Sequence, residues 1–221
     1  MGTQINPLYQ PKHWFNQKLA AECIESLKAK GFIAYYAQDR QEATDRILGE
    51  IPNGASVGIG GSVTLRDLGI PGILKEKGYT VYDHWDEALT QPEKREARNK
   101  QVLADVFLSG TNAVCLDGTL VNADGSGNRV SSMIFGPKIT IVVCGVNKIV
   151  GNLDEAFARI RQYAAPVNAR RLGAAMPCQN ITGYSSSPGI KLGCRVTTII
   201  EAPPTAKERF VVVVVNEDLG Y

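Results

Sequence analysis

The sequence predicts an α/β protein, a three-layer sandwich built around a mostly parallel sheet. Two observations support this prediction. Strand-like and helix-like segments alternate along the chain, which is typical of a parallel sheet covered by helices. The segment FVVVVV near the end is so continuously apolar that it needs cover on both faces. With 221 residues, 44% of them hydrophobic, the chain is long enough to form one large domain over residues 1–221.

The first half of the chain contains three strand-like and several helix-like segments. A helix with apolar residues at helical spacing covers residues 13–30, and Gly31 follows it as a stop signal. Asp39 has the position of an N-cap for a second helix that ends near Ile47. The remaining segments are the strands FIAYYA, ASVGIG and YTVYDHW, the short helices TLRDLGI and ILKEKG, and the longer charged helix PEKREARNKQVLADVF.

The second half is richer in strand-like pieces. FLSGTNAVCLDG and TLVNADGSGNRVSSMIFG alternate apolar and polar residues, and the turn signal NADGSGNR predicts a β-hairpin that feeds the central strand KITIVVCG. Asn152 is expected to cap the helix NLDEAFARIRQYA. A Pro-, Gly- and Ser-rich stretch at 173–193 predicts a long loop, after which RVTTIIE and FVVVVVNED read as strands.

The segment GIGGSVT, residues 58–64, joins a strand to a helix and has two interpretations. Glycines at a helix start allow close approach of an anion to free backbone N–H groups, so Gly58, Gly60, Gly61, Ser62 and Thr64 are candidate ligand-binding residues. The spacing matches neither the P-loop nor the dinucleotide-binding motif. In the alternative, the glycines only turn the chain and Ser62 caps the helix.

A second group of candidates follows later strands, where α/β folds hold their ligands. Asp117 and Asp124 are the candidate catalytic carboxylates, although Asp-Gly steps are also ordinary turn chemistry. The candidate ligand-binding residues in this part of the chain are Thr119, Asn122, Gly125, Asn128, Arg129, Lys138, Asn147 and Lys148.

Four motifs, in order, carry a resemblance to a known family. GIGGSVTLRDLGI, NAVCLDGTLVNADGSGNRVSSMIFGP, VVCGVNKIVGNLDEAFARIR and PCQNITGYSSSPG resemble the LUD domain family, the lactate-utilisation proteins. The resemblance spans nearly the whole chain. It implies a fold similar to that of ribose-5-phosphate isomerase, the glucosamine-6-phosphate deaminases and the coenzyme A transferases. In the related isomerases the glycine loop faces the ligand phosphate. It also implies a link with oxidation of L-lactate to pyruvate, often beside iron–sulfur subunits.

Three functions are compatible with this resemblance. The first is a protein of lactate or related 2-hydroxy-acid utilisation that binds a small anion at the glycine loop and the Asp-Gly hairpin, with no reaction assigned. The second is an isomerase or acyl-transferase type of enzyme that uses a carboxylate for proton transfer. The third is a non-catalytic assembly or regulatory subunit of a redox complex.

The cysteines and histidines give weaker signals. Cys115 and Cys144 lie in apolar strand-like runs and are expected to be buried, reduced thiols. Related stand-alone family members have a cysteine cluster after the Pro-Cys, whereas this chain has Cys178 and Cys194, too few for a four-ligand site, so no metal is predicted. His84 is flanked by Asp83 and Asp86, and a carboxylate neighbour favours the charged imidazole, so His84 is also a candidate general base.

Charge and hydropathy indicate the type of partner. The net charge is +2 and the charges are mixed along the chain, so nucleic acid is not an expected partner. The chain has neither a secretory signal pattern nor a long apolar run, so we expect a cytoplasmic protein that does not bind membranes. The expected partners are a small anionic ligand, such as a phosphate, carboxylate or thioester, a redox protein and further copies of this chain. The sequence leaves the identity of any cofactor open.

Overall fold

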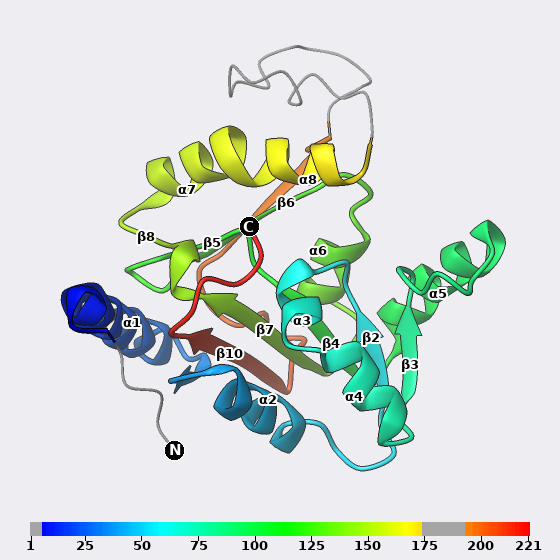
Figure 1. Ribbon diagram of the computed structural model, residues 1–221. Coiled ribbons are helices and arrows are strands. Elements are labelled where there is room, and N and C mark those ends of the chain that lie inside the picture. The colour runs from blue at the N-terminus through cyan, green and yellow to red at the C-terminus, as the bar shows by residue number, and fades with distance from the viewer. Residues whose placement is uncertain (1–5, 174–192) are drawn as a thin grey trace.

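A computed structural model describes residues 6–173 and 193–221 and contains a six-stranded central sheet (Figure 1). All neighbouring strands of this sheet run parallel. In sheet order the strands are β1 (Ile33–Ala37), β10 (Arg209–Val215), β7 (Ile139–Gly145), β4 (Val106–Gly110), β2 (Ser56–Ile59) and β3 (Thr80–Asp83). The predicted α/β class and parallel sheet are therefore confirmed.

Strands β7 and β10 lie in the interior of the sheet, as their apolar sequences predict. Their side chains alternate between two cores, because successive residues of a strand point to opposite faces. In β10, Val211, Val213 and Val215 pack on one face, and Phe210, Val212 and Val214 pack on the other. Both faces are thus covered, which agrees with the apolar side chains at every position from Phe210 to Val215.

Helices cover both faces of the central sheet. One face packs against α2 (Arg40–Gly49), α3 (Val63–Asp67) and α4 (Ile70–Glu76). The other packs against α1 (Gln10–Ala29) and α6 (Asn128–Ile134), while α5 (Gln91–Leu103) contacts β2 and β3. A short 3₁₀ turn, η1 (Pro7–Tyr9), precedes α1. The predicted caps Asp39, Ser62 and Asn152 each accept a hydrogen bond from a backbone N–H of their helix.

A second, smaller sheet lies beside α1 and has the strand order β8-β5-β6-β9. Helix α7 (Leu153–Arg159), a π-helical turn η3 (Ile160–Ala164) and helix α8 (Ala165–Arg171) run over this sheet as one continuous rod (Figure 1). Its strands are β5 (Ala113–Cys115), β6 (Leu120–Asp124), β8 (Ile149–Val150) and β9 (Val196–Ile200), and the 3₁₀ turn η2 (Val146–Lys148) connects β7 to β8.

The structure corrects the predicted hairpin. The tight turn lies at Asp117 and Gly118, between β5 and β6, and Gly118 has a φ of 84° that favours glycine. The segment NADGSGNR instead ends β6 and starts α6. Strand β6 pairs with β5 and β9, so RVTTIIE belongs to the small sheet. Most of the predicted loop at 173–193, including Cys178, lies outside the described residues.

None of the helices in the described ranges has both the length and the apolar composition that a membrane span requires.

Candidate functional site

A cavity of about 320 Å³ lies where several strands of both sheets end. In open α/β sheets the carboxyl ends of the strands are the usual place for ligands. The residues that follow the strands supply most of the wall: Gly61 and Ser62 after β2, His84 and Trp85 after β3, Thr111 and Asn112 after β4, and Gly125, Ser126 and Asn128 after β6.

The rod of α7, η3 and α8 closes the cavity on another side. Ile160, Ala164 and Asn168 from this rod line the cavity. A π-helical turn often marks a functional site, because it changes which residues of a helix face a neighbour. At the rim, the Arg171 guanidinium lies 4.1 Å from the centre of the Trp85 ring and its Nη2 donates a hydrogen bond to Asn168.

Positive charge dominates the cavity. Among the described residues that line it, the cationic side chains are Arg98, Arg129, Lys148 and Arg171, and Asp124 is the only acidic one. A cavity with this charge balance favours a negatively charged ligand, since burial strengthens the interaction between opposite charges.

Lys148 is the most deeply buried of these cations, with 3% of its surface exposed. Its Nζ donates a 2.8 Å hydrogen bond to Oγ1 of Thr64, and no salt bridge within the described residues includes it. Burial, together with nearby Arg159 and Arg129, lowers the pKa of Lys148 to about 8. A buried ammonium group thus faces the cavity without a carboxylate partner.

Arg129 is fully engaged with the protein. Its two Nη atoms donate to Oδ1 of Asn122 at 2.6 Å, Oδ1 of Asn112 at 2.8 Å and the carbonyl oxygens of Gly110 and Ala123. These acceptors come from β4, β6 and the turn after β4. Arg129 therefore ties the end of the central sheet to the small sheet.

The two candidate carboxylates have different surroundings. Asp124 lines the cavity, and its carboxylate accepts hydrogen bonds from the backbone N–H groups of Ser126, Arg129 and Val130, which holds the first turn of α6. Asp117 lies at the tip of the β5–β6 hairpin, where it pairs with Lys30 at 3.0 Å. Asp117 is not among the residues that line the cavity.

The glycines of the loop 58–64 permit close packing. A Cβ atom on Gly58 would lie 2.9 Å from Cα of Gln101, and one on Gly60 would lie 2.9 Å from Cζ of Phe107. Both distances are below normal contact, so these glycines let α5 and β4 approach β2. Only Gly61 and Ser62 of this loop, with Val63, line the cavity.

Gly61→Ala is expected to destabilise the protein by displacing Trp85. The new Cβ would lie 2.7 Å from the indole ring, which is also packed against the guanidinium groups of Arg66 and Arg171. We expect a loss of about 1–3 kcal/mol in the free energy of unfolding, as for other overpacked sites. Urea denaturation followed by circular dichroism measures it. Gly72→Ala is the control, since nothing lies within 4 Å of that Cβ; equal stability of both variants would contradict the prediction.

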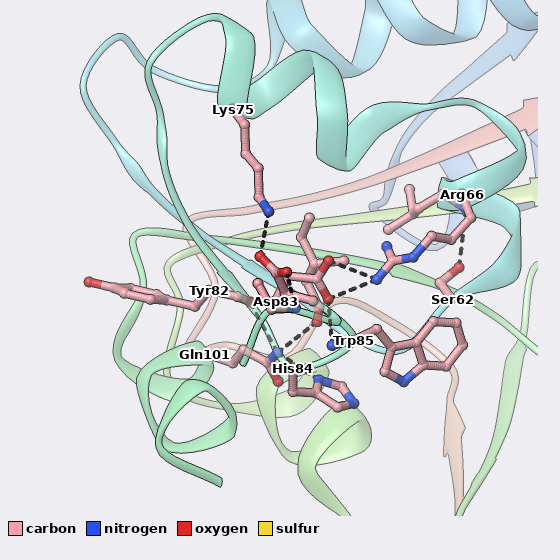
Figure 2. A network of polar contacts seen from close by, with 12 residues as sticks. Ser62, Arg66, Lys75, Tyr82, Asp83, His84, Trp85 and Gln101 are labelled. Carbon is pink, nitrogen blue, oxygen red and sulfur yellow. Dashed lines mark hydrogen bonds and ion pairs between the residues drawn. The ribbon is translucent and has the colours of Figure 1, made fainter. Parts of the chain in front are cut away.

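At His84, burial outweighs the effect of the carboxylate neighbour. Asp83 is held by Arg66, whose Nη2 donates to both carboxylate oxygens at 2.7 and 2.8 Å (Figure 2). His84 itself is 6% exposed. Burial, followed by the charge of Arg98, lowers its pKa to about 4, so the imidazole is neutral at physiological pH.

The cavity brings together about half of the residues singled out from the sequence. Asp124, Gly61, Ser62, Gly125, Asn128, Arg129 and Lys148 line it. Thr64 and Asn122 do not line the cavity but accept hydrogen bonds from Lys148 and Arg129, which do. Asn147 holds the chain near Leu219 and Gly220, and Lys138 pairs with Glu208 on the surface. Thr119 accepts a hydrogen bond from Lys30 near Asp117.

Several wall residues were missed. Trp85 and Asn112 follow strands directly, and the same strand-end rule that selected Asn128 could have found them. Arg98 lies in a helix with many exposed charges, and no local signal distinguishes it from its neighbours. Asn168 and Arg171 come from the rod beyond its π-helical turn, where the ordinary helical spacing does not apply.

The structure describes four of the cysteines. Cys115 and Cys144 are buried free thiols, as predicted, and so is Cys23, while Cys194 is partly exposed and lines the cavity. Within residues 6–173 and 193–221, no group of three or more His, Cys, Asp or Glu side chains is arranged to hold a metal ion.

Comparisons with known proteins agree with the architecture. The model of the LUD domain family matches residues 20–215. A search of curated proteins gives no match. Among solved structures, the crystal structure of a DUF162 family protein from Deinococcus radiodurans is similar, with a TM-score of 0.54 and 16% sequence identity over 90% of this chain and 98% of that one. The family model covers most of the sequence, and the chain therefore belongs to the LUD domain family.

Proposed function

We propose that this protein binds a small organic anion in the cavity and serves the utilisation of lactate or a related 2-hydroxy acid. The buried Lys148 carries the proposal. Its ammonium group has a hydroxyl partner and no counter-ion in the described residues, and an unpaired buried charge costs several kcal/mol. A bound carboxylate or phosphate would supply the missing negative charge.

Arg98 supports the same proposal. It lines the cavity, and its Nε atom is buried without a hydrogen-bond partner among the described residues. Buried guanidinium nitrogens are normally paired, and the charge of this guanidinium at the cavity wall favours an anion. Arg129, in contrast, already has protein acceptors and serves as support.

The size of the cavity favours a small ligand. Its volume of about 320 Å³ is at the lower end of the range for small-molecule sites, which begins at about 300 Å³. Lactate and pyruvate are small anions with one carboxylate. Family membership adds the association with lactate metabolism, since the family is named for lactate utilisation.

Calorimetric titration with L-lactate, pyruvate and inorganic phosphate tests the proposal at constant ionic strength. We expect binding of at least one of these anions and a higher melting temperature in its presence. Lys148→Met should weaken that binding at least about tenfold, because it removes the buried charge.

Lys138→Met is the matched control, since Lys138 is an exposed lysine paired with Glu208 outside the cavity. This variant should bind as the parent does. The proposal fails if none of the three anions binds, or if the two lysine variants weaken binding equally.

A further inference from the structure

His84 and Gln101 form a buried polar contact at the cavity wall (Figure 2). Gln101, in α5, is fully buried, and its Nε2 lies 2.9 Å from Nδ1 of His84. The same Nε2 lies 2.7 Å from the carbonyl oxygen of Ile59 and 3.1 Å from that of Tyr82. The end of the amide that touches His84 therefore also touches two backbone acceptors.

These two carbonyl groups fix the orientation of the Gln101 amide. A carbonyl oxygen can only accept, so the group that faces both Ile59 and Tyr82 must be the amide NH₂. Rotating the amide by half a turn would bring oxygen against oxygen at 2.7 Å. The hydrogen-bond donor toward His84 is therefore Gln101.

The orientation of Gln101 in turn fixes the tautomer of His84. The amide nitrogen of Gln101 cannot accept a hydrogen bond, so Nδ1 of His84, which faces it at 2.9 Å, carries no proton, and the proton of the neutral ring lies on Nε2. A doubly protonated ring would place two N–H groups against each other. Among the described residues Nε2 has no hydrogen-bond partner, and His84 lines the cavity with 6% of its surface exposed.

Charged groups around His84 oppose its protonation. Arg98 from α5 and Arg66 from α3 disfavour a positive ring, while Asp83 and Asp124 favour it. Asp83 forms an ion pair with Arg66, and the Asp124 carboxylate accepts hydrogen bonds from three backbone N–H groups. Together with burial, this keeps the pKa of His84 at about 4.

We propose that His84 binds the ligand as a neutral donor, presenting Nε2–H to an uncharged oxygen of the ligand, and that Gln101 is its positioning residue. The inference rests on the proposed function and names the substrate class. The cations of the cavity wall hold the carboxylate of the ligand, and its carbonyl or hydroxyl oxygen accepts from His84. A 2-oxo or 2-hydroxy acid, which has this second oxygen, therefore binds more tightly than a simple carboxylate.

Nitrogen NMR of histidine-labelled protein tests the tautomer directly. The chain has only two histidines, so in the His13→Gln variant every histidine signal comes from His84. We expect a protonated Nε2 and an unprotonated Nδ1 with no change between pH 5.5 and pH 8. Gln101→Met, which removes the donor, should introduce the other tautomer. A proton on Nδ1, or titration within this pH range, overturns the inference.

Ligand preference tests the recognition step. Pyruvate and L-lactate should bind at least about tenfold more tightly than propionate, which has the carboxylate but lacks the second oxygen. His84→Phe should abolish this preference, so that pyruvate and L-lactate bind no more tightly than propionate. The NMR test on the parent remains decisive if this variant does not fold. If all three acids bind equally, the proposed anion binding is supported and the proposed role of His84 is wrong. If none binds, the proposed function fails, and the role of His84 in ligand binding fails with it.

Discussion

Val213→Asp is expected to prevent folding. Val213 is completely buried in β10, where it pairs with Tyr35 of β1 on one side and Val143 of β7 on the other. Neighbouring strands pair with both edges of β10, and the Val213 side chain packs in the core beneath α2. A carboxylate at this position would therefore contact neither water nor a cationic side chain. Burial of an unpaired charge costs more than about 4 kcal/mol, comparable with the whole stability of a domain.

Soluble yield and far-ultraviolet circular dichroism measure this effect. The control is Ile199→Asp, which places the same carboxylate on the edge strand β9 at a position that is 45% exposed. That variant should lose less than about 1 kcal/mol. If Val213→Asp gave a soluble protein as stable as the parent, the interior position of β10 would be wrong.

Lys148→Met is expected to stabilise the ligand-free protein at neutral pH. Below about pH 8 the folded protein holds a buried, unpaired ammonium group, and its lowered pKa corresponds to a cost of about 3 kcal/mol. Methionine has a similar length and no charge. After allowing about 1 kcal/mol for the hydrogen bond lost by Thr64, we expect the free energy of unfolding to rise by about 2 kcal/mol at pH 7.

This gain should shrink as the pH rises. Between about pH 8 and the ordinary lysine pKa of about 10.4, the unfolded chain keeps the Lys148 proton while the folded protein has lost it. Because the unfolded state then binds more protons, higher pH stabilises the parent but not the variant. Urea denaturation at pH 7 and pH 9.5 should show the difference falling by more than half.

Lys207 provides the comparison for this experiment. Burial also lowers its pKa to about 8, but its Nζ donates to the carbonyl oxygens of Ser132 and Pro137. Lys207→Met leaves those carbonyl groups unpaired, so it should bring no gain at pH 7. Equal stabilisation by both substitutions would mean that the missing counter-ion of Lys148 is not the cause. A buried lysine that lowers the stability of the folded protein is typical of a functional site.

The sequence predicted those parts of the fold that depend on the residues of a single helix or strand. The Val-rich run of β10 could only be an interior strand, and Asp39, Ser62 and Asn152 have the side chains that cap helices. The hairpin was misplaced because Asp117-Gly118 and NADGSGNR both have turn chemistry. The choice between them depends on β9, which pairs with β6 from more than 70 residues away in the sequence.

The candidate site was predictable only where it follows strands. Asp124, Asn128 and Lys148 could be placed at one edge of a parallel sheet because strand ends meet there. Arg98 reaches the cavity from a helix whose other charges face solvent, so its role depends on how α5 is rotated against β2. The state of His84 could not be predicted from Asp83, its neighbour in sequence, because burial and the charge of Arg98 outweigh the effect of that carboxylate.

The π-helical turn η3 makes the cavity sensitive to chain length. Such a turn amounts to one extra residue inserted into an α-helix, so a chain with one residue fewer between Ile160 and Ala164 would form a regular helix there. Each residue advances an α-helix by about 100°, and α8 would therefore rotate by that angle relative to α7. Asn168 and Arg171 would then turn away from the cavity, although neither residue is itself substituted. Insertions and deletions in this rod are thus a route by which relatives of this protein could acquire a different ligand.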